Sequence, residues 1–342
     1  MKGARLSVLV ETADRPTQVR TANRLARLLD RRSAYLPLAW HTVRRIGPAA
    51  VLRTQFPMLL PDAGAPPTVS VEFTNYCNLR CPYCTSPLKL REQGLMSEET
   101  LACLVEQLPA CARPRVRVVG NGEATIHPKF AQFIRALSGA TRMLTLITNG
   151  QWKHEETALA ILSAPVHLVE VSLDGTTKEH YERSRPGANF ERLLTNLVRL
   201  RELRAKDRRT LINIRVMLRP SERADETRIL GFWKGYADTV MSQYLIDAGG
   251  RDDDVYAPVR GTDRYPRCTL PFKVLDVHWN GNVPMCAYSG RQIGDPEGLR
   301  LGNIRSRTLM DLWNDALIRQ YRRAHRDRDL SGMPICNGCF GS

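Results

Sequence analysis

The chain has 342 residues, 43% of them hydrophobic, and its 50 lysines and arginines outnumber 35 aspartates and glutamates for a formal charge of +15. Such a chain can bury a globular core in one large or two modest domains. No segment approaches the roughly 20 apolar residues of a membrane helix, and the first residues lack an export signal, so we expect a cytoplasmic protein without membrane contact. Nine cysteines in such a protein favour metal ligation over disulfides.

The positive charge is mostly arginine, since only eight of the cations are lysines. The basic residues fall on predicted helices such as 197–209 and 317–328 without interleaved stacking aromatic residues, which argues against a nucleic-acid partner. A non-catalytic or RNA-directed role stays open as an alternative on the charge alone.

In chain order, residues 1–66 combine a basic amphipathic pattern with a Pro- and Gly-rich connector, which predicts an N-terminal helical extension and a linker. Over residues 67–260, short apolar runs alternate with amphipathic stretches, an α/β pattern that predicts a partial (β/α)6 barrel with buried parallel strands. The predicted strands are 68–73, 115–120, 143–149, 166–174, 211–218 and 239–246. The clearest helical stretches are 97–108, 128–137 and 190–205.

Residues 261–342 form a predicted small α+β domain. Two strands flank an Asn280-Gly281 turn, a strong hairpin signal, and a polar loop leads to one predicted helix over 308–324.

The segment "CNLRCPYC" places Cys77, Cys81 and Cys84 in a short loop directly after the first predicted strand. Reactive groups of (β/α) barrels gather at this end of the strands. A structural zinc site needs four ligands, and no fourth Cys or His lies nearby. Three thiolates can instead hold three irons of a cubane cluster and leave the fourth iron open to another ligand.

This loop resembles the cluster-binding loop of the radical S-adenosylmethionine (SAM) superfamily. The resemblance implies a [4Fe–4S] cluster whose open iron binds SAM and which cleaves it to a 5'-deoxyadenosyl radical. "GNGEA" (120–124) is similar to the family's Gly-Gly-Glu-Pro segment, with Asn121 and Ala124 as departures. The SAM contacts implied by this and neighbouring segments are Tyr83, Gly122, Glu123, Ser172, Asp174, Arg185 and Arg215. The two arginines could equally form ordinary ion pairs.

A second cysteine set comprises Cys268, Cys286, Cys336 and Cys339. Their spacing alone fits either a zinc ion or a second [4Fe–4S] cluster. The surrounding segments "NGNVPMC" and "LGNIRSRTLMDLWN" resemble the SPASM/twitch extension of radical SAM enzymes, and this resemblance implies an auxiliary cluster. With only four cysteines, the domain is similar to the short twitch form found in the 2-deoxy-scyllo-inosamine dehydrogenase type. Cys103 and Cys111 are interpreted as buried inert thiols.

A cluster fully ligated by protein can accept the electron that a substrate radical loses when an alcohol becomes a carbonyl. We therefore expect dehydrogenation of a polyhydroxylated sugar or aminocyclitol in natural-product biosynthesis, with a reductase or a flavodoxin or ferredoxin as electron donor. The candidate general bases are Asp247, Asp252, Asp253, Asp254 and His278. Epimerisation, decarboxylation of a sugar acid and maturation of a ribosomal peptide remain alternatives.

Overall fold

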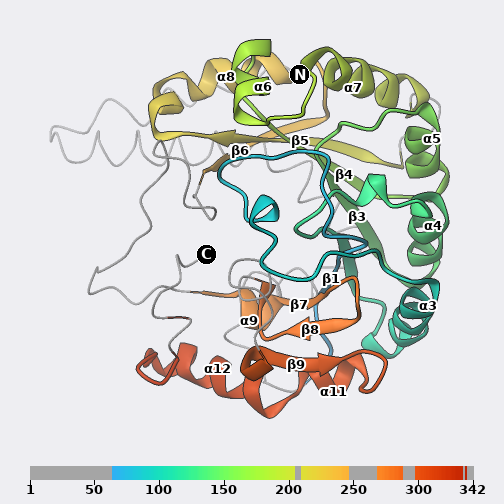
Figure 1. Ribbon diagram of the computed structural model, residues 1–342, viewed down its shortest axis with the longest axis vertical. Coiled ribbons are helices and arrows are strands. Elements are labelled where there is room, and N and C mark those ends of the chain that lie inside the picture. Colours follow the sequence, from blue (N-terminus) through green and yellow to red (C-terminus); the bar gives the residue numbers. More distant parts are fainter. Residues whose placement is uncertain (1–63, 205–208, 246–267, 288–296, 334–335, 337–342) are drawn as a thin grey trace, which may run out of the picture.

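The computed structural model describes residues 64–204, 209–245, 268–287, 297–333 and 336. Within them, a curved and wholly parallel sheet has the strand order β6-β5-β4-β3-β2-β1-β7 (Figure 1). Its strands are β1 (Thr68–Val71), β2 (Arg115–Val118), β3 (Met143–Thr148), β4 (Leu168–Asp174), β5 (Leu211–Leu218), β6 (Thr239–Tyr244) and β7 (Val274–Val277). All six strands predicted for the barrel are present, and the partial barrel is confirmed.

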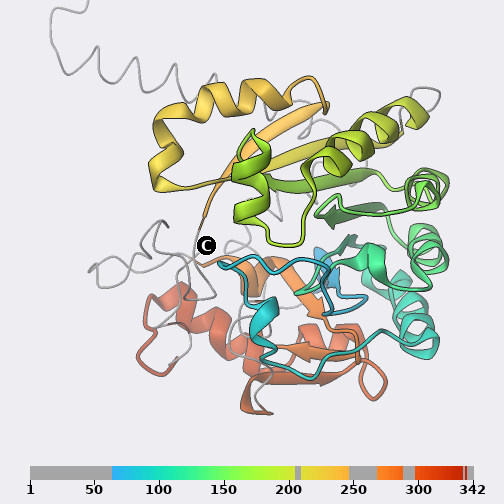
Figure 2. The same ribbon diagram turned by 45° about the horizontal axis from the view of Figure 1, so that its top comes forward.

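Helices cover the outer face of this sheet, and Figures 1 and 2 show them in one layer around it. They are α3 (Glu98–Gln107), α4 (Phe130–Ala140), α5 (Glu155–Ser163), α6 (Lys178–Ser184), α7 (Phe190–Arg204) and α8 (Glu226–Trp233). The first of them begins where the sequence favours it, because Ser97 caps α3 by accepting the Thr100 N–H and Glu98 and Glu99 occupy its first turn. Short 3-10 helices are η2 (Ser86–Leu88), η3 (Pro109–Cys111), η4 (Ala124–Ile126), η5 (Pro220–Asp225) and η6 (Glu297–Leu299).

The two faces of the sheet differ in chemistry. Outward side chains such as Val116, Leu144 and Ile212 are fully buried against the helices and form the main core. Because side chains alternate along a strand, the intervening residues line the inner face of the barrel. Many of these inner residues are polar or charged, among them Arg117 and Glu170.

The predicted turn at Asn280-Gly281 is present: the His278 N–H donates to the Asn282 carbonyl (2.9 Å), and Gly281 has a φ of 84°. The strands on either side nevertheless belong to different sheets, so the hairpin prediction was incomplete. β7 extends the barrel sheet by pairing in parallel with β1, because the edge of β1 offers an unused ladder of hydrogen bonds. β8 (Asn282–Pro284) pairs with β9 (Arg300–Asn303) in an antiparallel ribbon.

The single helix predicted over 308–324 was wrong. The structure has two helices, α11 (Leu309–Trp313) and α12 (Ala316–Asp327). The break has a local cause, because the Asp315 carboxylate accepts the Leu317 N–H (2.8 Å) and starts a new helix. α12 packs against the short helix α9 (Leu270–Lys273) near the C-terminal cysteines.

The predicted N-terminal extension falls almost wholly outside the described residues, and the boundary placed at residue 260 lies in a segment that is also outside them. Both stay predictions. No helix in the described part of the chain is both long and apolar enough to span a membrane.

Candidate active site at the mouth of the barrel

The three-cysteine loop lies between β1 and η2, at the end of the barrel where the strands finish. Backbone N–H groups point at two of its sulfur atoms: Leu79 donates to Cys77 Sγ and Ser86 donates to Cys84 Sγ, both at 3.4 Å. The Cys84 N–H donates to the Cys81 carbonyl (3.1 Å), which closes a tight turn between the last two thiols. Such N–H groups also stabilise cluster-bound thiolates.

The donor set of this loop fits a cluster better than a single ion. Among the described residues, no three His, Cys, Asp or Glu side chains converge as one metal ion requires. Three separated thiols on one loop suit three different irons. Burial, assisted by the charge of Glu123, raises the pKa of the Cys77 thiol to about 12, and burial also raises that of Cys81. Iron binding must therefore displace protons from these thiols.

Three of the predicted SAM contacts form one buried network above this loop. The Tyr83 hydroxyl donates to Asp174 Oδ2 (2.9 Å), and Arg185 donates to Asp174 Oδ1 through Nε (3.2 Å) and Nη2 (2.9 Å). Burial, together with the charge of Asp174, raises the pKa of Tyr83 well above its ordinary value, even though Arg185 opposes the rise. The network ties the cluster loop to the end of β4 and to α6.

Gly122 and Glu123 occupy the predicted place after β2, and the structure gives each a physical reason. A Cβ at Gly122 would lie 2.3 Å from the Tyr76 carbonyl oxygen and 2.4 Å from that of Thr74, so only glycine fits against the cluster loop. Glu123 is 3% exposed. Its carboxylate accepts the Thr148 hydroxyl and the Asn149 N–H, both at 2.7 Å, and thereby joins the ends of β2 and β3.

The remaining two predicted SAM contacts lie on the inner face of the barrel. Ser172 is half-buried on β4, opposite Arg215 of β5. Arg215 makes a bidentate ion pair with Glu170, through Nε to Oε1 (2.8 Å) and Nη2 to Oε2 (2.7 Å). Their contact with SAM stays a prediction.

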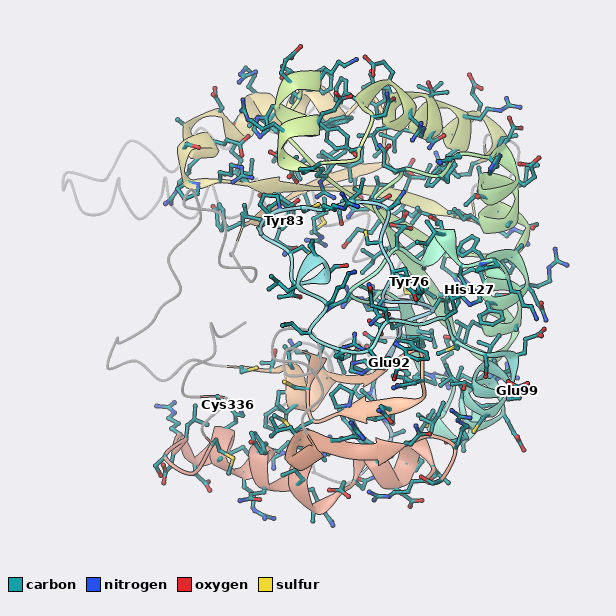
Figure 3. All side chains as sticks on the ribbon, viewed as in Figure 1. Tyr76, Tyr83, Glu92, Glu99, His127 and Cys336 are labelled. Atoms are coloured by element: carbon teal, nitrogen blue, oxygen red, sulfur yellow. The ribbon has the colours of Figure 1, made fainter. Side chains whose placement is uncertain are left out.

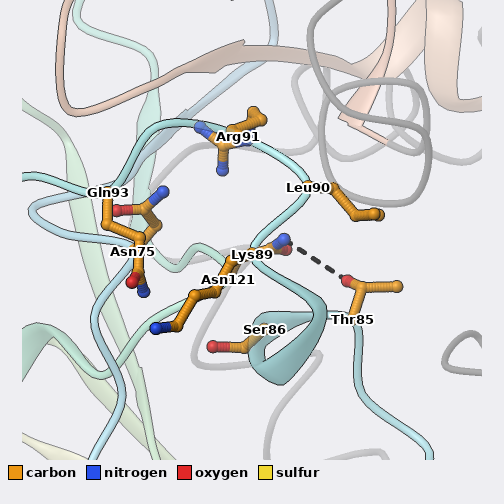
Figure 4. A pocket seen from close by; sticks show the side chains of 8 residues that line it. All are labelled: Asn75, Thr85, Ser86, Lys89, Leu90, Arg91, Gln93 and Asn121. Carbon is orange, nitrogen blue, oxygen red and sulfur yellow. Dashed lines mark hydrogen bonds between the residues drawn. The ribbon is translucent and has the colours of Figure 1, made fainter.

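Sequence reasoning missed a polar cavity beside the cluster loop, with about 200 Å³ of empty space that opens to solvent (Figure 4). It is lined by Asn75, Thr85, Ser86, Lys89, Leu90, Arg91, Gln93 and Asn121. In this cavity, Asn121 donates a hydrogen bond to the Thr85 hydroxyl (3.3 Å). Asn121, which departs from the family's Gly-Gly-Glu-Pro segment, thereby links the segment after β2 to the cluster loop. At its edge, Arg91 forms a bidentate pair with the buried Glu72 of the inner barrel. The residues that line this cavity follow no regular spacing in the sequence from which the cavity could have been predicted.

Cys336 lies in another part of the molecule than the cluster loop: Figure 3 places Tyr83 in the barrel and Cys336 beside α12. Cys286, directly after β8, and Cys336 are both buried. Burial, together with the charges of Cys336 and Cys286, raises the pKa of Tyr321 on α12, and His325 Nε2 lies 3.5 Å from Cys336 Sγ. Cys268 precedes α9, and Cys339 lies outside the described residues. Of the described thiols, Cys286 and Cys336 are far apart in sequence but lie near the same side chain of α12.

The structure describes only one of the candidate general bases, His278. Asp247 and Asp252, with Asp253 and Asp254, lie outside the described residues. His278 has no exposed surface and sits 3.8 Å from Asp276 at the end of β7. Of the two remaining thiols, Cys111 is buried, and Cys103 on α3 donates to the Ile304 carbonyl (3.2 Å).

Two protein families match the sequence of this chain. The radical SAM superfamily matches residues 71–228, and SPASM, an iron–sulfur cluster-binding domain, matches residues 268–340. The chain carries a radical SAM domain followed by a SPASM domain. The first implies SAM and a [4Fe–4S] cluster, and the second implies additional iron–sulfur clusters; the cysteines assigned to each remain a prediction.

Named proteins with similar sequence include the mycofactocin maturase MftC of Mycobacterium ulcerans (strain Agy99). It is 29% identical over 136 residues, which are 39% of this chain and 37% of MftC. The match therefore spans little more than a third of that relative.

Two solved structures share the fold. BtrN in complex with AdoMet and 2-DOIA has a TM-score of 0.54 and 18% identity, covering 81% of this chain and 94% of BtrN. Streptococcus suis SuiB bound to precursor peptide SuiA has a TM-score of 0.62 and 14% identity, covering 81% of this chain and 70% of SuiB. At these identities, the likeness shows a common fold.

Proposed function

We propose that this radical SAM enzyme is an oxidoreductase that converts an alcohol of a polyhydroxylated small molecule into a carbonyl. The observation that carries the proposal is the C-terminal set of four cysteines, Cys268, Cys286, Cys336 and Cys339. Four thiolates complete the ligation of a cluster and leave no position for substrate, so an electron-accepting role suits it better than substrate binding. The coverage of 94% of BtrN, whose structure contains 2-DOIA, supports a small substrate.

When bound, SAM and the two clusters supply a 5'-deoxyadenosyl radical that takes a hydrogen atom from the substrate carbon, and an acceptor for the electron that the substrate radical then loses. The chain contributes the surroundings. Tyr83, Asp174 and Arg185 form a closed polar wall above the cluster loop. Glu123 fixes the strand ends from which SAM would be held. The hydroxyl proton leaves to a base, for which Asp247, Asp252 and His278 remain the proposed residues.

A second candidate is modification of a ribosomally made peptide. It is favoured by the similarity to the maturase MftC and by the shared fold with SuiB, which was solved with its precursor peptide. A short peptide encoded beside the gene, changed in mass by the enzyme and SAM, would favour this candidate.

The test is electron accounting with deuterated substrates. Reductive cleavage of SAM takes up one electron, and oxidation of the alcohol returns one, so an oxidoreductase forms more product than the dithionite supplied. We expect deuterium from the candidate carbon of a sugar or aminocyclitol in 5'-deoxyadenosine, and a product lighter by two hydrogens than an unlabelled substrate control. Product that tracks dithionite one for one, with unchanged mass, would replace this proposal with epimerisation.

A matched pair of variants separates the electron acceptor from the radical step. Cys286→Ala should leave SAM cleavage intact but lower the yield of oxidised product per 5'-deoxyadenosine at least about tenfold, because the electron loses its acceptor. Cys111→Ala, which removes a buried thiol outside both sets, serves as the control. Circular dichroism must match wild type for each variant, since a cluster can also hold a domain together.

A further inference from the structure

Trp279, in the turn after β7, lies against the segment that follows the cluster loop. Its indole N–H donates to the Glu92 carbonyl (3.3 Å). Its ring covers Gly94 so closely that a Cβ at this glycine would lie no more than 2.6 Å from three ring atoms. The φ of Gly94 is not positive, so its backbone would accept another residue. The ring of Trp279 is therefore what requires a glycine at residue 94.

The segment that Trp279 covers is bonded to the start of the cluster loop. The Asn75 side chain donates to the Glu92 carbonyl (2.8 Å) and accepts the Gly94 N–H (2.9 Å). The Thr74 hydroxyl donates to the Gly94 carbonyl (2.7 Å). The Glu92 carbonyl thus accepts hydrogen bonds from both Trp279 and Asn75, and this shared acceptor joins the turn after β7 to the cluster loop.

The start of the cluster loop is held from its other side by the segment after β2. The Glu123 N–H donates to the Tyr76 carbonyl (2.8 Å), and Gly122 lies against the same carbonyl. Both Gly122 and Glu123 are predicted SAM contacts. Tyr76 directly precedes Cys77. The start of the loop therefore lies between the predicted SAM contacts on one side and the segment under Trp279 on the other.

We infer that Trp279 is a positioning residue for the SAM site. It holds the segment around Gly94 against the cluster loop, and thereby fixes the first thiol relative to the residues that meet SAM. A ligand binds more tightly to groups that are already held in place, because less freedom is lost on binding. The inference goes beyond the proposed function, since SAM binding is common to all radical SAM reactions. It rests on the prediction that the cluster loop holds the SAM-binding cluster.

The support from Trp279 does not run through the C-terminal thiols. β7 pairs with β1 in the barrel sheet, so the turn that carries Trp279 is anchored in the barrel. Loss of the proposed second cluster in Cys286→Ala should therefore leave this contact and SAM cleavage intact. The same segment contributes Gln93 to the polar cavity beside the cluster loop. Trp279 thus also fixes one wall of that cavity.

The first test is equilibrium binding of SAM to the iron-loaded full chain by isothermal titration calorimetry, without oxygen or reductant. Trp279→Ala should weaken SAM binding about tenfold or more, as the loss of a group that orients a metal site usually does. Iron should stay at about eight per chain, which shows that no cluster is lost. Phe232→Ala is the matched control, because it removes another partly exposed aromatic ring from the outer helix α8.

A double-variant cycle tests the contact itself. In a chain that keeps Trp279, Gly94→Ala places a methyl group where the ring lies, so SAM binding should weaken as it does in Trp279→Ala. In the Trp279→Ala background the ring is gone, and Gly94→Ala should have little further effect. Two changes that merely destabilise the protein independently would instead add.

Three results overturn the inference: unchanged SAM affinity in Trp279→Ala at full iron content, an equal loss in Phe232→Ala, or a Gly94→Ala effect that is the same with and without the ring. If Trp279→Ala does not fold, Trp279→Phe replaces it and should still weaken SAM binding, because a ring remains but the N–H to the Glu92 carbonyl is lost. Failure of the oxidoreductase proposal is a separate result, since it is decided by product and electron counts and not by SAM affinity.

Discussion

The two thiol sets of this protein are built in opposite ways. Cys77, Cys81 and Cys84 lie within one loop, and hydrogen bonds inside that loop set their positions. The C-terminal cysteines are spread from Cys268 to Cys339 in the sequence; of the described ones, Cys268 precedes α9, which packs against α12, and Cys336 lies beside α12. A local motif can therefore be removed without changing the fold around it, whereas a distributed site and its domain depend on each other.

Removal of the local set should have the largest effect on activity. Replacing Cys77, Cys81 and Cys84 together by alanine removes every protein ligand of the SAM-binding cluster, so SAM cleavage should fall below detection. Iron per chain should drop from about eight to about four, the content of one remaining cubane. Circular dichroism should stay that of wild type. An unfolded triple variant would show that the loop, too, depends on its cluster.

Removal of all iron should affect the two regions unequally. In chelator-treated protein, amide hydrogen exchange should speed up most in α9, β8 and α12, since the proposed second cluster would join these elements through the C-terminal thiols. Protection in α4 and α7 should change little, because those helices pack on the barrel core. Equal loss of protection in both regions would remove the distinction between a local and a distributed site.

The barrel mouth offers a test of how strongly the local loop is fixed. Asp174→Asn leaves the guanidinium of Arg185 buried without its charged partner and weakens the bond from Tyr83. The free energy of unfolding should fall by about 3–5 kcal/mol in a urea titration. The control is Asp225→Asn, whose exposed pair with Arg228 should contribute little to stability. Equal effects of both variants would contradict the buried network.

The smallest expected effect concerns the contact between the two regions. Gln107 of α3 donates to the Ile304 carbonyl (2.9 Å) and accepts the Leu309 N–H (2.7 Å), and so links the barrel to the segment before α11. Gln107→Ala should lower the free energy of unfolding by about 1–2 kcal/mol. Glu106→Ala, at the exposed neighbouring position, should change it by less than about 0.5 kcal/mol. A loss in the control as large as that in Gln107→Ala would assign the effect to the helix itself.

The sequence was most informative where the signal is local. Alternating apolar runs predicted the six barrel strands, and the spacing of Cys77, Cys81 and Cys84 predicted their shared loop. Gly122 could be predicted as part of a motif, but its reason, the approach of the Tyr76 carbonyl, needs coordinates.

Tertiary pairing could not be predicted in the same way. The addition of β7 to the barrel depends on an open strand edge, and a turn signal does not report which sheet a strand will join. The break before α12 could have been predicted from Asp315, an aspartate that caps the new helix. The helical periodicity continues across this position and favoured one helix instead. The ion pairs of Glu170 with Arg215 and of Glu72 with Arg91 join residues 45 and 19 positions apart, for which the chain carries no pattern.

We propose that the two thiol sets hold two clusters and that only the first has an iron open to SAM. The most direct measurement is electron paramagnetic resonance of the reduced, reconstituted protein, recorded with and without SAM. Wild type should show two overlapping cluster signals, of which SAM changes one. The variant lacking Cys77, Cys81 and Cys84 should show one signal that SAM leaves unchanged. A single signal in wild type, or a SAM-dependent change in that variant, would contradict the assignment of the two sites.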